Sequence, residues 1–161
     1  MFSVFREFQP MPTAQSIYAG QSMVRELTDA NFWNIFYDPH KVLVVDFWAT
    51  WCQPCNDVAA AIVEAARRCY KGPQGPVKFY HVQSNPTVNP KLDKAFGFTA
   101  LPAVLFYYTS TGRPPTRSAP LLEGSLGPEE GFREPARMFV PDEYLFRIRA
   151  ILRRHGHPVV C

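Results

Sequence analysis

A buried strand that leads directly into a helix is the feature that most restricts how this chain folds. Residues 42–48, VLVVDFW, form an apolar run broken by a single acid, Asp46. Such a run is typical of a strand buried on both faces in the middle of a parallel sheet. From 54 to 70, apolar side chains recur every three or four positions, which predicts a helix. Cys52 and Cys55 lie where the strand gives way to this helix.

The rest of the chain alternates between strand and helix patterns in the same way. Val24 and Leu27 are spaced as in a short strand, and Thr28 is placed to cap a helix that Asp29 begins. Further strands are expected at 77–82, 103–108 and 120–124, and further helices at 89–98 and 142–155. This order predicts an α/β fold with a central mixed β-sheet flanked by helices on both faces.

The active loop is expected at the carboxyl end of a strand, where open α/β sheets place their sites. Two segments match no regular element: the N-terminal twenty residues, and residues 125–140 with the sequence SLGPEEGFREPARMFV.

Length and composition fit one globular domain. The chain has 161 residues, of which 47% are hydrophobic and 14% aromatic, enough to fill a core. Its 17 basic and 14 acidic residues are interspersed, so no basic block predicts binding to nucleic acid. No run of apolar residues is long enough to predict a membrane span.

The N-terminus lacks the order of a secretory signal, so we expect a cytoplasmic protein. The opening segment carries Arg6, Gln9 and Ser16 with a single acid, Glu7, which leaves a mitochondrial targeting segment as the alternative.

Three roles are open to Cys52 and Cys55: metal ligands, a structural disulfide, or a redox pair. A zinc site needs four ligands and usually shows two such pairs, whereas this chain has one. A total of 4 cysteines is too few for a disulfide scaffold, and a chain that is not exported normally keeps its thiols reduced. Cys69 follows the apolar spacing of the helix and is expected to be an inert core thiol. Cys161 is expected to be exposed and free, with an intermolecular disulfide as the alternative.

The position of the pair at the start of a helix favours redox chemistry. Unpaired backbone N–H groups and the positive end of the helix dipole favour thiolate over thiol there. Cys52 is then the natural nucleophile toward a disulfide, and Cys55, one turn into the helix, is placed to resolve the mixed disulfide. Pro54 suits the first turn, where its missing N–H costs no hydrogen bond.

The segment VVDFWATWCQPC, residues 44–55, resembles the active-site segment of thioredoxins, and TALPAVLFY, residues 99–107, is similar to the loop that carries the cis-proline of that family. The resemblance covers roughly residues 22–124 and the last helix. It implies a thioredoxin fold, with residues 22–161 as the domain, residues 1–21 as an N-terminal extension, and an insertion at about 125–140.

The resemblance also implies roles for individual residues. Cys52 would be the attacking thiol, Cys55 the resolving thiol, and Asp46 a buried carboxylate that exchanges a proton with the resolving thiol through water, its pKa raised by burial. The residues expected to contact the substrate chain are Trp51, Gln53, Pro54, Leu101, Pro102 (in a cis peptide bond) and Gly124. No cofactor and no metal are expected, because the electrons pass between cysteine pairs.

Several residues depart from the family pattern. Gln53 replaces the usual glycine between the cysteines, and Asn56 stands where a lysine is common. Phe79 occupies a strand position where a buried lysine often neighbours the aspartate, so Asp46 is expected to be harder to ionise. His81 fits a strand and is expected to take no part in chemistry.

These features predict a thiol-disulfide oxidoreductase that reduces disulfides in substrate proteins and is itself reduced by a thioredoxin-reductase-like electron donor. The alternative is a thioredoxin-fold subunit or adaptor of a larger protein assembly, with the redox pair incidental or regulatory. The N-terminal extension and the insertion at 125–140 motivate this alternative, because long loops in compact domains are often functional.

Overall fold

A mixed sheet forms the centre of the computed structural model, which describes residues 10–96, 98, 100–110, 112 and 135–161. Within these residues the strand order is β1-β3-β2-β4. Strands β1 and β2 each pair with β3 in parallel, and β4 runs antiparallel to β2. The strands are β1 (Val24–Leu27), β2 (Val42–Trp48), β3 (Val77–Gln83) and β4 (Ala103–Tyr108). The expected α/β class with a mixed central sheet is confirmed.

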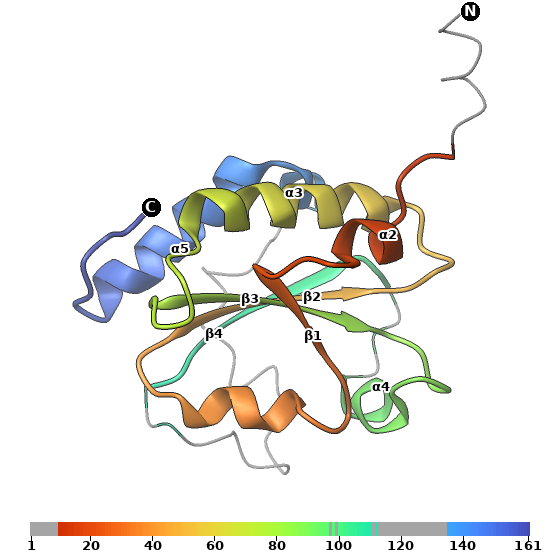
Figure 1. Ribbon diagram of the computed structural model, residues 1–161, viewed down its shortest axis with the longest axis horizontal. Coiled ribbons are helices and arrows are strands. Elements are labelled where there is room, and N and C mark those ends of the chain that lie inside the picture. The colour runs from red at the N-terminus through yellow and green to blue at the C-terminus, as the bar shows by residue number, and fades with distance from the viewer. Residues whose placement is uncertain (1–9, 97, 99, 111, 113–134) are drawn as a thin grey trace, which may run out of the picture.

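Helices cover both faces of this sheet (Figure 1). On one face lie α2 (Ala14–Tyr18), α3 (Pro54–Cys69) and α5 (Pro141–Arg154). On the other lie the 3-10 helix η1 (Phe32–Tyr37), drawn in orange, and α4 (Pro90–Phe96). A second 3-10 helix, η2 (Pro135–Phe139), immediately precedes α5.

Strand β2 divides the core in two, because successive side chains on a strand point to opposite faces. Its even-numbered apolar residues, from Val42 to Trp48, pack with α3 and α5, and its odd-numbered residues, from Leu43 to Phe47, pack with η1. All of its residues are buried, as the continuous apolar run predicts. Asp46 belongs to the even-numbered set, so its carboxyl group lies on the same face as the helix that carries the cysteine pair.

Two segments expected to be irregular contain short helices. Residues 14–18 form α2, which packs against α3, and residues 135–139 form η2, which contacts both α3 and α5. The strand expected at 120–124 lies outside the described residues.

The helix expected to begin at Asp29 begins at Phe32 instead and is a 3-10 helix. The reason lies in the partners of the Asp29 carboxylate, which accepts hydrogen bonds from the backbone N–H groups of Lys91 and Leu92. These groups belong to the first turn of α4, where backbone N–H groups have no partner within the helix. Asp29 therefore stabilises the start of another helix rather than beginning its own.

Cys69 and Cys161 are joined by a disulfide, so the expectation of an inert core thiol and a free terminal thiol was wrong. After α5 the chain reverses at Gly156, where a φ of 72° favours glycine. The C-terminal segment then reaches the end of α3 (Figure 1), with the two Cα atoms 4.8 Å apart. The bond joins positions 92 residues apart, a distance over which cysteine spacing carries no information about pairing.

Replacing Cys161 by serine is expected to lower the free energy of unfolding of the oxidised protein by about 2–4 kcal/mol, because the disulfide restricts the unfolded chain. Urea unfolding without reductant measures this difference, and full reduction of both proteins should remove it. Peptide mapping without reduction should recover a Cys69–Cys161 cross-linked peptide. Free thiols at both positions in the native protein would contradict the pairing.

Candidate active site

Cys52 and Cys55 form a disulfide at the amino end of α3, with their Cα atoms 5.4 Å apart. The pair occupies the turn between the end of β2 and the start of α3. Backbone hydrogen bonds close this turn: the N–H of Cys52 donates to the carbonyl of Ala49 at 3.1 Å, and the N–H of Cys55 donates to the carbonyl of Cys52 at 3.2 Å. The structure therefore holds the oxidised form of the pair.

The residues around the disulfide differ sharply in exposure. Trp51 is 73% exposed, and Gln53 and Pro54 are also exposed, whereas Cys52 is 3% exposed and Cys55 fully buried. A large aromatic side chain at the surface beside a redox pair offers an apolar contact to an incoming protein chain. The residues next to the cysteines are thus exposed, while both cysteines are covered.

The peptide bond between Leu101 and Pro102 is cis, as expected. In the antiparallel register Phe47 lies opposite Ala103, so Pro102 lies at the carboxyl end of β2, where the cysteine turn begins. Leu101 is half-buried and packs against both halves of the core. Gly124, also expected at this site, lies outside the described residues.

Asp46 is fully buried in the middle of β2. Its Oδ2 accepts a hydrogen bond from the Tyr18 hydroxyl, and its Oδ1 has no hydrogen-bond partner among the described residues. Burial raises the pKa of Asp46 to about 7, and the hydrogen bond from Tyr18 opposes this rise. The expected upward shift is confirmed, and it places the carboxyl group where it can both take and return a proton near neutral pH.

Tyr18 is the residue of this site that the sequence interpretation missed. It is buried on α2, and both its burial and the nearby Asp46 raise the pKa of its phenol well above the ordinary value. Tyr18 therefore stays protonated and acts as the donor. Two signals in the sequence point to α2: Thr13 and Ser16 have the spacing of a reciprocal helix cap, and Ala14 and Tyr18 are four positions apart, on one helical face.

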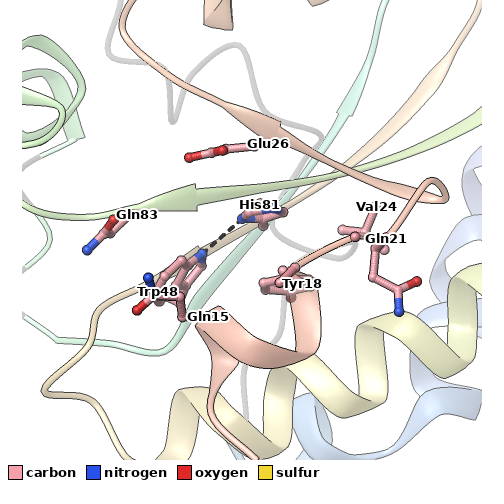
Figure 2. A pocket seen from close by; sticks show the side chains of 10 residues that line it. Gln15, Tyr18, Gln21, Val24, Glu26, Trp48, His81 and Gln83 are labelled. Atoms are coloured by element: carbon pink, nitrogen blue, oxygen red, sulfur yellow. Dashed lines mark hydrogen bonds between the residues drawn. The ribbon is translucent and has the colours of Figure 1, made fainter.

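His81 and Trp48 extend the same cluster (Figure 2). The rings of Tyr18 and His81 stack, with centroids 4.2 Å apart and planes inclined by 6°. The indole N–H of Trp48 donates to His81 Nδ1 at 3.1 Å, so the neutral imidazole carries its proton on Nε2. Burial lowers the pKa of His81 to about 4, which keeps this ring uncharged at neutral pH. His81 thus has a structural partner on each side, which its strand pattern alone does not reveal.

A pocket of about 370 Å³ opens beside the cluster, and Tyr18, Trp48 and His81 form part of its wall together with Glu26 and Gln83 (Figure 2).

Within the described part of the chain, no three His, Cys, Asp or Glu side chains are grouped as metal ligands. None of the described helices has the length and apolarity needed to cross a membrane.

Asn56, one of the departures from the family pattern, connects the active-site helix to α2. Its Oδ1 accepts a hydrogen bond from the backbone N–H of Ala14 at 2.8 Å. Ala14 is the first residue of α2, and its N–H has no partner within that helix. A lysine side chain has no acceptor and could not make this bond.

A disulfide between cysteines three positions apart, at the amino end of a helix that follows a buried central strand, defines the site of a thiol-disulfide oxidoreductase. Comparison with known proteins agrees. The family model described as Thioredoxin matches residues 23–119. The chain is 31% identical to thioredoxin 1 of Nostoc sp. over 86 residues, which are 53% of this chain and 75% of that protein. The chain belongs to the thioredoxin family.

Other comparisons point the same way. The chain is 30% identical over 95 residues to a protein of Mycobacterium leprae called bifunctional thioredoxin reductase/thioredoxin. These residues are 59% of this chain and 19% of that protein. The structure of thioredoxin f2 from Chlamydomonas reinhardtii matches 84% of this chain and 98% of that chain with a TM-score of 0.51 and 18% identity, which shows the thioredoxin fold. The protein is thus a thiol-disulfide oxidoreductase of thioredoxin fold.

The variant Asp46→Asn is expected to be more stable than the parent at pH 8, by about 2–4 kcal/mol, and to differ little from it at pH 4. The pKa of Asp46 rises from 3.8 to about 7 on folding, so between these values the folded chain binds the extra proton and stability falls as the pH rises. Asparagine cannot ionise, so the variant does not lose stability over this pH range.

Urea unfolding at pH 4 and pH 8 measures this difference. Asp57→Asn is the matched control, because it makes the same substitution at an exposed carboxylate on the active-site helix. A gain from Asp46→Asn of equal size at both pH values would contradict the assignment of the buried charge.

Proposed function

We propose that this protein reduces disulfide bonds in other proteins, with Cys52 as the attacking thiol and Cys55 as the resolving thiol. The observation that carries the proposal is the Cys52–Cys55 disulfide at the amino end of α3, bordered by the exposed Trp51 and by cis-Pro102.

In the reduced protein, Cys52 lies just before the first turn of α3, where backbone N–H groups favour its thiolate. The thiolate attacks one sulfur of the substrate disulfide. A bond forms between Cys52 and that sulfur, the substrate disulfide breaks, and the other substrate sulfur leaves as a thiolate that takes up a proton.

Cys55 then completes the cycle. Asp46 accepts the Cys55 proton through water, and the Cys55 thiolate attacks Cys52. The Cys52–Cys55 disulfide forms, the bond to the substrate breaks, and the second substrate sulfur leaves as a thiolate. Two electrons have passed from the cysteine pair to the substrate. Burial of Cys55 supports its role, since a covered thiol reacts with the sulfur beside it more readily than with a second protein.

The substrate chain is proposed to lie across the exposed side of the pair. Its contacts are Trp51, Gln53, Pro54, Leu101, Pro102 and Gly124. The half-buried Leu101 and Pro102 and the three exposed residues around Cys52 support this placement. An extended chain beside Pro102 would bring its disulfide to Cys52.

The oxidised pair needs two electrons before it can act again, and we propose a thioredoxin-reductase-like protein as their source. The name of the Mycobacterium leprae relative, which joins a thioredoxin reductase and a thioredoxin, supports this donor. We also propose that the protein works in the cytoplasm, that residues 22–161 form the thioredoxin-like domain, and that residues 1–21 and about 125–140 are additions to it.

Reduction of insulin disulfides with dithiothreitol as donor tests the function. Cys52→Ser is expected to abolish the activity above the dithiothreitol background, because the attacking thiolate is lost. Cys55→Ser should also stop turnover, but it should accumulate a mixed disulfide between Cys52 and the substrate, visible by mass spectrometry.

Cys161→Ser is the matched control, since it removes a cysteine far from the reactive pair and should keep the parent rate at a temperature where both proteins are folded. Full activity of Cys52→Ser would rule out the proposed mechanism.

A further inference from the structure

Tyr18 lies in a segment outside the family resemblance, yet its hydroxyl reaches the buried carboxylate of the site. We propose that Tyr18 is a positioning residue for the resolving step: it holds Oδ2 of Asp46 by a hydrogen bond and leaves Oδ1 to receive the proton of Cys55. The inference rests on the proposed function, because it assigns to Asp46 the proton transfer described there.

Tyr18 is held firmly in place. Its helix α2 is capped at Thr13, and the backbone N–H of Ala14 is bound to Asn56 on the active-site helix at 2.8 Å. The ring of Tyr18 is 3% exposed and stacks on His81. These contacts come from α2, α3 and β3, so the hydroxyl has little freedom to leave the carboxylate.

The two carboxyl oxygens of Asp46 differ in their surroundings. Oδ2 accepts from Tyr18, whereas Oδ1 is buried and has no partner among the described residues. A buried carboxylate oxygen without a donor is costly and is a stronger proton acceptor than one that is hydrogen-bonded. The hydrogen bond therefore both fixes the orientation of the carboxyl group and distinguishes the oxygen that exchanges the proton.

The other described groups around Asp46 do not replace this donor. From β3, Phe79 is apolar and His81 is neutral, with Nδ1 bound to Trp48. From α5, the Tyr144 hydroxyl donates to the carbonyl of Met138 at 2.7 Å, and Tyr144 is near enough for Asp46, after burial, to raise the pKa of its phenol. From α3, the two cysteines of the reactive pair belong to the core cluster on the same face of β2, and in this structure they are bonded to each other. Among the described residues, Tyr18 is thus the side chain that donates to Asp46, and Phe79, at the strand position where the resemblance implies a lysine, offers no donor.

The step balances in atoms and electrons with the two cysteines, Asp46 and the substrate, water relaying the proton from Cys55 to Asp46 as proposed above. In the mixed disulfide, the Cys55 thiol gives its proton to Oδ1 of Asp46, the Cys55 sulfur bonds to that of Cys52, and the bond from Cys52 to the substrate breaks. The substrate leaves as a thiolate. Tyr18 keeps its own proton throughout, because burial and the neighbouring Asp46 keep the pKa of the phenol far above neutral.

The test uses the full chain with Tyr18→Phe, which removes the hydroxyl and keeps the ring on His81. In the parent, the hydrogen bond from Tyr18 opposes the rise that burial causes in the pKa of Asp46. Without this donor the pKa rises further, so the carboxylate forms only at higher pH. The pH profile of mixed-disulfide resolution, measured by rapid quenching, should shift upward by about one to two pH units, with a fall of about tenfold in the rate at pH 7. A profile that coincides with that of the parent would overturn the proposal.

Tyr107→Phe is the matched control. Tyr107 is also a buried tyrosine, but it packs in the other half of the core and its hydroxyl has no partner among the described residues. The same substitution there should leave the pH profile unchanged. If Tyr18→Phe proves too unstable to assay, Asn56→Ala is the second variant, because it removes the hydrogen bond that holds Ala14 of α2 to α3. It should shift the pH profile in the same direction but by less. No shift would count against the proposal.

A double variant separates positioning from a general effect on the fold. If Tyr18 acts through Asp46, adding Tyr18→Phe to Asp46→Asn should slow resolution no further, whereas an equal slowing in both backgrounds would overturn the proposal. A parent-like rate for Asp46→Asn would remove the proposed role of Asp46 and that of Tyr18 with it, while leaving the roles of the cysteines intact. A slow Asp46→Asn with a parent-like Tyr18→Phe would remove only Tyr18.

Discussion

A carboxyl group in the middle of a strand buried on both faces is the constraint on which the rest of this structure depends. The seven residues of β2 are all buried, and Asp46 is the charged one among them. A buried carboxylate without compensation is strongly destabilising, so it either stays protonated or requires donors nearby. Here the pKa of about 7 shows that one donor compensates only in part. The residual cost is what suits the group to the proton transfer proposed for it.

The buried carboxyl group also explains the role of the N-terminal helix α2. Taken alone, five residues capped by Thr13 would be too short to persist as a helix in water. The helix is stabilised by burial of Ala14 and Tyr18 in the core and by the hydrogen bond to Asn56. The helix supplies the Tyr18 hydroxyl, which donates a hydrogen bond to Asp46. Asn56, a departure from the family pattern, is therefore connected to Asp46 through this helix.

Helix α3 has a disulfide at each end, and the two differ in setting. The Cys52–Cys55 disulfide closes a turn of a few residues beside the exposed Trp51. The Cys69–Cys161 disulfide joins the last residue of α3 to the end of the chain across 92 positions, with Cys69 fully buried. Local spacing reveals the first kind of pair, because both cysteines belong to one turn. The second kind depends on where the chain returns after α5.

The sequence by itself determined the α/β class, most of the element boundaries, the redox pair, the cis-proline and the burial of Asp46, because each depends on a local pattern or on a short motif. Only the tertiary structure decided that Asp29 stabilises α4, that His81 stacks on Tyr18, and that Tyr18 reaches the carboxylate. Each of these contacts joins segments distant in the chain, and hydrophobic periodicity shows which face of an element is buried without showing what lies against it. Tyr18 could be assigned to a helix from its cap and spacing, but its partner 28 residues away follows only from the packing of α2 over β2.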